Sequence, residues 1–203
     1  MDNVIFFVDG FNLYHSLDSN PNLHKYKWLN ITKLTKLFLK KNEHISDIYY
    51  FTALATWAPN KVKRHKIYIK ALELNNVKIV YGEFRRRTKK CPICKKQYVT
   101  YEEKQTDVNI AIHLFRLAIQ DKYDKAFILS GDSDLIPSIK SVQNTFPQKS
   151  LGVIIPIGRR AELLKQTCDF HMKLKEKHLQ SSLFEKTIDL GNNKKLVCPP
   201  NWC

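Results

Sequence analysis

Hydrophobic runs of strand length alternate along this chain with segments of helical period. The run at 4–8 is continuously apolar, which is typical of a strand buried on both faces of a parallel sheet. Asn30 can cap a helix that begins at Ile31, and Pro59 suits the first turn of another. We expect strands at 4–8, 48–54, 77–81, 126–129, 151–155 and 170–174, and helices at 11–17, 31–38, 59–74, 106–119, 135–142 and 161–166.

The alternation of strands and helices predicts an α/β fold with a doubly wound parallel sheet that carries helices on both faces. Residues 85–104 interrupt this rhythm, and from Lys175 the chain becomes polar. We therefore expect one domain over 1–178, which includes 85–104 as a small basic insert, and a C-terminal tail over 179–203.

The charge of the chain is strongly unbalanced. Its 203 residues include 34 Lys and Arg against 19 Asp and Glu, a formal net charge of +15, which favours a polyanionic partner. No apolar run approaches the roughly 20 residues that span a bilayer, and no amphipathic face suits a membrane surface. Nucleic acid is thus the expected partner. The N-terminal residues lack the features of a signal peptide, and the cysteines are few and unevenly placed, so we expect a cytoplasmic location.

Aspartates follow the predicted strands where a parallel sheet forms its sites, beyond the carboxyl ends. Asp9 and Asn12 follow the first strand, Asp132 and Asp134 follow the fourth, and Asp107 opens the helix after the insert. Each aspartate alone could be an ordinary helix cap. Several carboxylates in one pocket repel one another unless a cation neutralises them, and Mg²⁺ or Mn²⁺ prefers such oxygen ligands. In so basic a protein, this arrangement suits cleavage of phosphodiesters.

Three motifs carry a resemblance to a known family. They are Phe-Val-Asp-Gly-Phe-Asn at 7–12, Glu-Glu-Lys-Gln-Thr-Asp at 102–107 and Leu-Ser-Gly-Asp-Ser-Asp at 129–134, followed by Val-Ile-Ile-Pro-Ile-Gly-Arg at 153–159. In this order, over roughly residues 3–178, the chain resembles the NYN domain, in the LabA-like branch of the PIN-like nuclease superfamily. The combination is specific, whereas Gly-Asp-Ser-Asp alone would be a weak signal.

The resemblance implies a PIN-like, Rossmann-like fold and metal-dependent endonucleolytic cleavage of RNA. A second hypothesis is a regulatory protein that keeps the fold and binds nucleic acid but turns over little. By resemblance, Ser130 orients a carboxylate or contacts phosphate, and Asn12 positions an ion, a water or a phosphate. The residues that would hold Mg²⁺ or Mn²⁺ are Asp9, Asp107, Asp132 and Asp134.

The insert is the densest positive stretch of the chain. Tyr98 and Tyr101 are interleaved with its cations, a combination that suits single-stranded RNA because cations bind phosphates and rings stack on bases. The alternative is a solvated charge run on an exposed hairpin. The candidate substrate-binding residues here are Arg85, Arg86, Arg87, Lys89, Lys90, Lys95, Lys96 and Lys104.

The cysteines suggest a second metal. Cys91 and Cys94 have the spacing of half a tetrahedral zinc site and resemble a zinc-ribbon-like insert. A redox role is disfavoured because the pair does not stand at a strand-to-helix junction. Either Cys198 and Cys203 complete the site, or two chains of a homodimer each supply one pair, or the thiols stay unmetallated. Cys168 is most simply a buried small hydrophobic residue.

Overall fold

The central strand β1 (Asp2–Asp9) separates two hydrophobic cores. Phe6 and Val8 lie in the core on one face of the sheet, and Ile5 and Phe7 lie in the core on the other. All four side chains are fully buried, as the continuous apolar run predicts. The structure is a computed structural model that describes residues 1–202.

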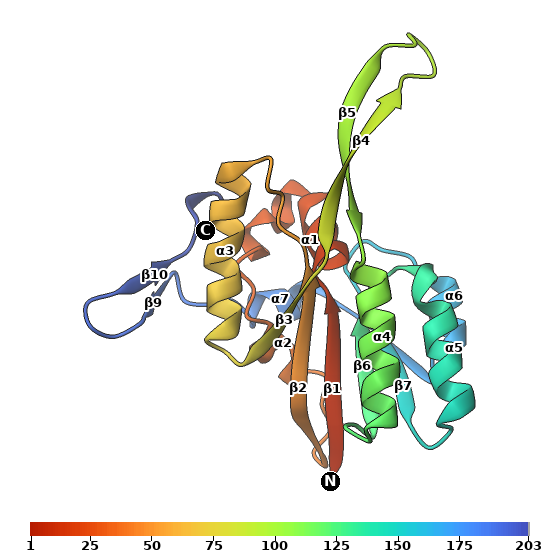
Figure 1. The fold of residues 1–203 in the computed structure, drawn as a ribbon. Coiled ribbons are helices and arrows are strands. Elements are labelled where there is room, and N and C mark those ends of the chain that lie inside the picture. Colours follow the sequence, from red (N-terminus) through yellow and green to blue (C-terminus); the bar gives the residue numbers. More distant parts are fainter. Residues whose placement is uncertain (203) are drawn as a thin grey trace.

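Six parallel strands form the sheet in the order β3-β2-β1-β6-β7-β8 (Figure 1). The chain runs outward from β1 through β2 and β3, returns to the centre at β6, and then runs outward the other way. The order therefore reverses between β1 and β6, where open α/β sheets bind their ligands. The fold class predicted from the sequence is confirmed. The remaining strands are β2 (Glu43–Thr52), β3 (Val77–Tyr81), β6 (Lys125–Leu129), β7 (Ser150–Ile155) and β8 (Phe170–Lys173).

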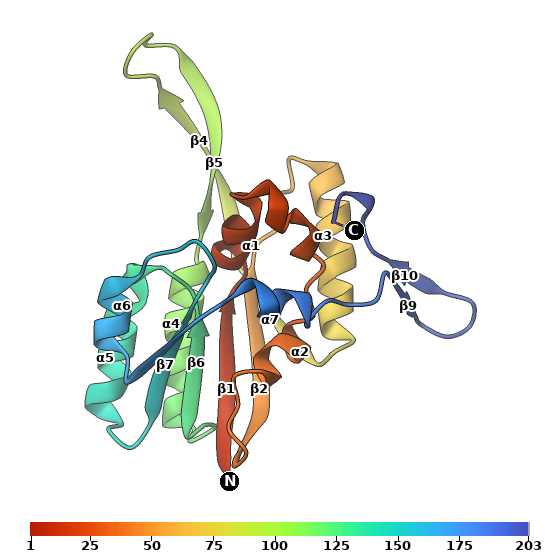
Figure 2. The same cartoon turned by 180° about the vertical axis from the view of Figure 1, so that it is seen from behind.

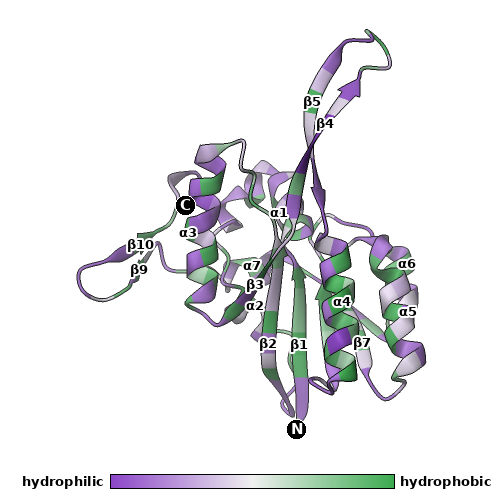
Figure 3. Ribbon diagram, in the orientation of Figure 1, coloured by the Kyte–Doolittle hydropathy of each residue, from purple (hydrophilic) through white to green (hydrophobic). Residues whose placement is uncertain are grey.

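Helices cover both faces of the sheet, so each face has its own core (Figures 1 and 2). In Figure 3 the inner strands are mainly hydrophobic, whereas the helices mix polar and hydrophobic residues. The first core is covered by α1 (Gly10–Asp18), α2 (Ile31–Lys36) and α3 (Pro59–Glu73), and the second by α4 (Thr106–Ile119), α5 (Ile136–Thr145) and α6 (Glu162–Thr167). Short 3₁₀ turns occur at Pro21–Tyr26, Ser133–Leu135 and Pro200–Trp202.

Strand β2 begins at Glu43, well before the predicted start at Ile48. Polar residues at the beginning of β2 conceal this part of the strand from a hydrophobic pattern. The polar start is nevertheless accommodated in the fold, because the buried Lys125 ammonium donates to the Glu43 carboxylate at 2.7 Å. A pairing between residues so far apart in the sequence leaves no local signal.

The C-terminal segment packs against the first core. It contains α7 (Glu176–Gln180) and an antiparallel hairpin of β9 (Thr187–Asp189) and β10 (Lys195–Val197). Phe184 and Trp202 are buried in the core, and the Trp28 indole N–H donates to the Glu185 carbonyl at 2.9 Å. Its few apolar residues are too widely spaced to form a periodic pattern. The boundary at 178 therefore marks a change in composition, and the packing continues across it.

Residues 85–104 lie in a long antiparallel hairpin of β4 (Glu83–Lys90) and β5 (Gln97–Lys104). Figure 1 shows this hairpin projecting well beyond the sheet, with the turn that contains Cys91 and Cys94 at its tip. None of the helices within residues 1–202 is long and apolar enough to cross a membrane.

Candidate functional site

The adjacent carboxyl ends of β1 and β6 bring together two of the motifs. Val8 pairs with Leu129 in the parallel register, so the next residues, Asp9 and Ser130, lie side by side. The Ser130 hydroxyl donates to Asp9 Oδ2 at 2.9 Å. Motifs separated by about half the chain thus meet at the reversal of strand order.

Asp9 is almost fully buried and has two fixed partners. Its Oδ1 accepts the backbone N–H of Asn12 at 2.9 Å, which caps α1, and its Oδ2 accepts the Ser130 hydroxyl. Gly10 allows the start of α1 to lie close against β2, because a Cβ at this position would lie 2.6 Å from the Phe51 carbonyl oxygen. The capping role and a functional role therefore fall on the same carboxylate.

Two further hydrogen bonds join the turns after β1 and β6. Asn12 Oδ1 accepts the Gly131 N–H at 3.0 Å, and Ser130 Oγ accepts the Asp132 N–H at 3.1 Å. Ser130 has no exposed surface, which fits the expected role of orienting a carboxylate and leaves it no access to phosphate.

These turns form the floor of an open polar cavity of about 610 Å³. Asp107 reaches it from the first turn of α4. Asp134 is exposed at the rim, where its N–H donates to Asp132 Oδ1, and it does not line the cavity. The predicted site residues in the lining are Asp9, Asn12, Asp107 and Asp132.

The cavity also contains residues that the sequence analysis did not select. Glu103 lies near the end of β5, shortly before Asp107 in the chain, and Arg159 and Arg160 follow β7. The rule that sites lie beyond strand ends could have identified the two arginines. Glu103 stands within the motif at 102–107, but it was given no role because it lies in a charged insert.

Burial raises the pKa values of two acidic residues in the cavity, and their neighbours add to this effect. Burial raises the pKa of Asp9 to about 6, and the charges of Asp107 and Glu103 add to this effect. Burial also raises the pKa of Asp107 to about 6, with further contributions from Asp132, Glu103 and Asp134. Ionising this group of carboxylates is therefore costly unless a cation approaches.

The donor set suits a hard divalent cation in its chemistry, because carboxylate and amide oxygens are the ligands that Mg²⁺ and Mn²⁺ prefer. Burial, and after it the neighbouring carboxylates, raise the pKa values of Asp9 and Asp107, and such an ion would favour their ionised forms. Within residues 1–202, however, no three His, Cys, Asp or Glu side chains are grouped closely enough to hold an ion as they stand. Binding would have to draw the carboxylates together.

The two faces of the β4–β5 hairpin differ. Phe84 and Tyr101 line the acidic cavity, and Arg86 lies on their face because it pairs with Tyr101 and side chains alternate along a strand. Arg87 lies on the other face, where it forms an ion pair with Glu102 at 4.0 Å. The other predicted cations of the insert are exposed, and the ones that pair with Glu83 or Glu102 are Arg85, Lys89 and Lys104.

The turn at the tip of the hairpin has a tight geometry. The Cys91 carbonyl accepts the Lys95 N–H at 3.0 Å, and Lys95 has a left-handed φ of 56°. Backbone N–H groups of Cys94 and Ile93 point at the Cys91 sulfur and lower its pKa, which favours the thiolate that binds metal.

The expectation that the C-terminal cysteines complete this zinc site fails for Cys198. Cys198 is disulfide-bonded and buried, and the C-terminal segment ends beside α3, far from the hairpin tip (Figures 1 and 2). Cys203 lies outside the described residues. Cys168 is buried in the second core, so the prediction of a buried small hydrophobic residue is confirmed, and burial raises its pKa to about 12.

Comparison with known proteins identifies the family of this protein. A family model described as the NYN domain matches residues 3–175. The chain belongs to the NYN domain family, and this places it in the PIN-like nuclease superfamily.

Two individual proteins are similar to this chain. The 6-hydroxy-3-succinoylpyridine 3-monooxygenase of Pseudomonas putida is 23% identical over 186 residues, which cover 74% of this chain. The match spans only 58% of that protein's length. A crystal structure of a protein of unknown function from Vibrio parahaemolyticus matches with a TM-score of 0.60 at 14% identity, covering 90% of this chain and 96% of the other, and it shows the shared fold.

We predict that Asp9→Asn stabilises the protein when no divalent metal is present. The pKa of Asp9 is about 6 in the folded protein against 3.8 as an ordinary aspartate, so the unfolded chain releases its proton first as the pH rises. Stability therefore falls between about pH 4 and pH 6 and stays lower above that range. Removing this charge should raise the free energy of unfolding at neutral pH by about 1–3 kcal/mol.

Urea denaturation in EDTA across this pH range measures the effect. Asp2→Asn is the matched control, because Asp2 lies at the opposite end of the same strand and outside the cavity. A variant of Asp9 that is less stable than the wild type at neutral pH, with the same pH dependence, would contradict the prediction.

Proposed function

We propose that this protein is a metal-dependent endoribonuclease that cleaves RNA at the acidic cavity. The proposal is supported chiefly by one observation: carboxylates from the end of β1, the start of α4 and the turn after β6 line one cavity at the reversal of strand order. Membership of the NYN family adds a general link to nucleases. The alternative remains an RNA-binding regulatory protein with little turnover.

The residues of the cavity have separate roles in this proposal. Asp9, Asp107 and Asp132 hold Mg²⁺ or Mn²⁺, and Asp134 supports the site from its rim. When bound there, such an ion would acidify a water and neutralise charge on the phosphate. Arg159 and Arg160, which line the same cavity, offset the negative charge of the phosphate oxygens. Asn12 keeps its Nδ2 donor for phosphate, because its Oδ1 is engaged by Gly131.

We predict that Asp132→Asn strongly slows cleavage. Labelled single-stranded RNA is incubated with Mn²⁺, and its cleavage is followed by gel electrophoresis. Loss of one metal-holding carboxylate should slow the reaction on the order of 100-fold or more. Asp2→Asn should cleave at the wild-type rate. Equal cleavage by wild type and Asp132→Asn would refute the enzyme hypothesis, and binding without cleavage by either would favour the regulatory alternative.

We propose that the hairpin guides the RNA strand along the face that continues into the cavity. Arg86→Ala should therefore weaken binding of single-stranded RNA by up to about tenfold. Arg87→Ala removes the same charge from the other face, where Glu102 already compensates it, and should change the affinity by less than about twofold. Fluorescence anisotropy in EDTA at fixed salt measures the RNA affinity of both variants. An equal loss of affinity in the two would contradict this path of the RNA along the hairpin.

At the hairpin tip, we propose a zinc ion shared by two chains. Cys91 and Cys94 supply two of the four ligands that structural zinc requires, and within residues 1–202 no third ligand is grouped with them. A second copy of the same turn would complete the tetrahedral set.

We predict that the protein binds zinc at about half an ion per chain, because each site needs four thiolates. Metal analysis gives the zinc content, and light scattering gives the mass. Cys91→Ser should lose the zinc and become monomeric. Cys168→Ser should keep the zinc and stay dimeric, because Cys168 is buried in the second core. One zinc per monomeric chain, or zinc retained in Cys91→Ser, would exclude the shared site.

A further inference from the structure

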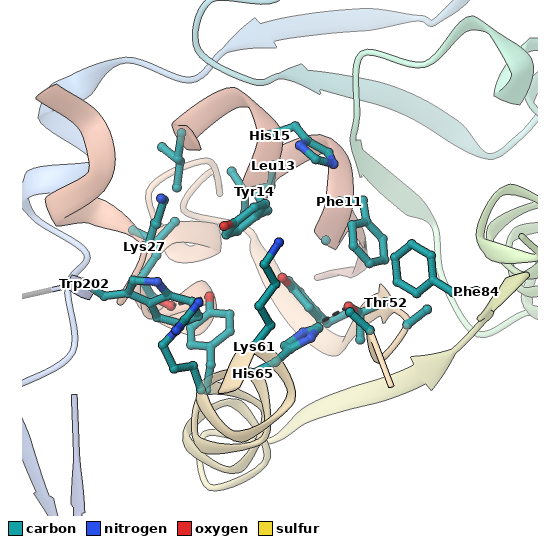
Figure 4. A pocket seen from close by; sticks show the side chains of 18 of the residues that line it. Phe11, Leu13, Tyr14, His15, Lys27, Thr52, Lys61, His65, Phe84 and Trp202 are labelled. Carbon is teal, nitrogen blue, oxygen red and sulfur yellow. Dashed lines mark hydrogen bonds between the residues drawn. The ribbon is translucent and has the colours of Figure 1, made fainter. Parts of the chain in front are cut away.

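A second cavity, of about 300 Å³, lies beside the acidic one and is built quite differently. It lies between α1, α3 and the base of the β4–β5 hairpin (Figure 4). Its walls are mainly aromatic, and no Asp or Glu is among its lining residues. Phe11, His15, Phe84 and Tyr101 line both cavities, so a single wall separates them.

The shared wall and the adjoining Trp57 form a cluster of aromatic rings in contact. Trp57 stacks on Tyr101 with their ring centroids 3.7 Å apart and their planes within 4°. Phe84 meets the Trp57 ring edge-on at 4.7 Å, and Phe11 meets Phe84 edge-on at 5.3 Å. Aromatic surfaces of this kind hold planar rings by stacking.

The interior of this cavity has unused hydrogen-bonding groups. The Tyr50 side chain is 4% exposed, and within residues 1–202 its hydroxyl forms no hydrogen bond. His65 contacts the Thr52 hydroxyl at 3.1 Å, and burial lowers the pKa of His65 to about 4, so the ring is neutral at physiological pH. Neutral donors and acceptors of this kind suit the polar edge of a heterocycle.

Two cations of α3 line the same cavity without a carboxylate partner among residues 1–202. Figure 4 shows the Lys61 side chain extending into the cavity. Arg64 also lines it, and the buried Arg64 Nε has no hydrogen-bond partner. An unpaired buried donor is costly, so these groups favour a ligand that carries negative charge.

We propose that the aromatic cavity binds one unstacked base of the RNA strand that reaches the acidic cavity, with Lys61 and Arg64 binding the phosphate of that nucleotide. A nucleotide combines the planar ring, the polar edge and the negative charge that this lining complements. Unstacked bases are recognised in just this manner, by stacking and by hydrogen bonds to their edges. The inference rests on the proposed function in its choice of RNA as the bound strand.

The test compares two labelled probes in EDTA, where no cleavage occurs. One is a single-stranded RNA of about ten nucleotides, and the other is the same ribose–phosphate backbone with every base removed. Stacking of a base is worth about 1–3 kcal/mol, so the wild type should bind the complete RNA about tenfold or more tightly than the abasic strand. Fluorescence anisotropy gives both dissociation constants.

Three variants assign this preference to the cavity. Ala55→Trp fills the cavity and should remove the preference for bases, and Tyr50→Phe, which deletes only one oxygen, should reduce it severalfold. Lys61→Ala should weaken the binding of both probes. Lys63→Ala, which removes the same charge from an exposed position of α3 outside the cavity, should weaken them less. Circular dichroism establishes which variants are folded.

Equal affinity of the wild type for the two probes would overturn the proposal, as would an undiminished preference in folded Ala55→Trp and Tyr50→Phe. Quenching of tryptophan fluorescence by nicotinate, without competition from the RNA, would instead assign the cavity to a small planar acid and also overturn it. A base preference in a protein that cleaves no RNA with Mn²⁺ would leave the base site standing and refute only the nuclease function.

Discussion

The parallel pairing of β1 with β6 is the constraint on which the site depends. It sets the ends of two strands side by side at the reversal of strand order, so that Asp9 and Ser130 can form a buried hydrogen bond. From that bond the other contacts follow, because Ser130 holds the turn of Asp132 and Asn12 holds Gly131. The pairing is stable because the side chains of β1 are buried on both faces of the sheet.

Negative and positive side chains lie on different surfaces of this molecule. The acidic cavity concentrates carboxylates whose pKa values rise because of burial and mutual repulsion. Cations lie around it, on the hairpin, on α3 and after β7, although Glu102 compensates several of those on one face of the hairpin. Lys61 and Arg64 line one cavity, Arg159 and Arg160 line the other, and none of these four forms an ion pair within residues 1–202.

Much of the fold could be predicted because its signals are local. The run at 4–8 predicted a strand buried on both faces, and Pro59 and Asn30 marked helix starts that the structure confirms. The early start of β2 and the docking of residues 179–202 could not be predicted, since both depend on partners distant in the sequence, such as Lys125 for Glu43 and the Trp28 indole for the C-terminal segment. The disulfide-bonded state of Cys198 was equally inaccessible to a spacing argument.

The sequence by itself determined the α/β class, the acidic residues beyond the strand ends and the paired cysteines of the insert, because each is encoded in a short pattern. Only the tertiary structure decided that Asp134 stands at the rim, that Glu103 and Arg159 join the cavity, and that Arg86 and Arg87 face opposite ways. It alone revealed the aromatic cavity, whose walls come from α1, α3, the hairpin and the C-terminal segment. Such a cavity depends on how distant segments pack, and no local pattern records that packing.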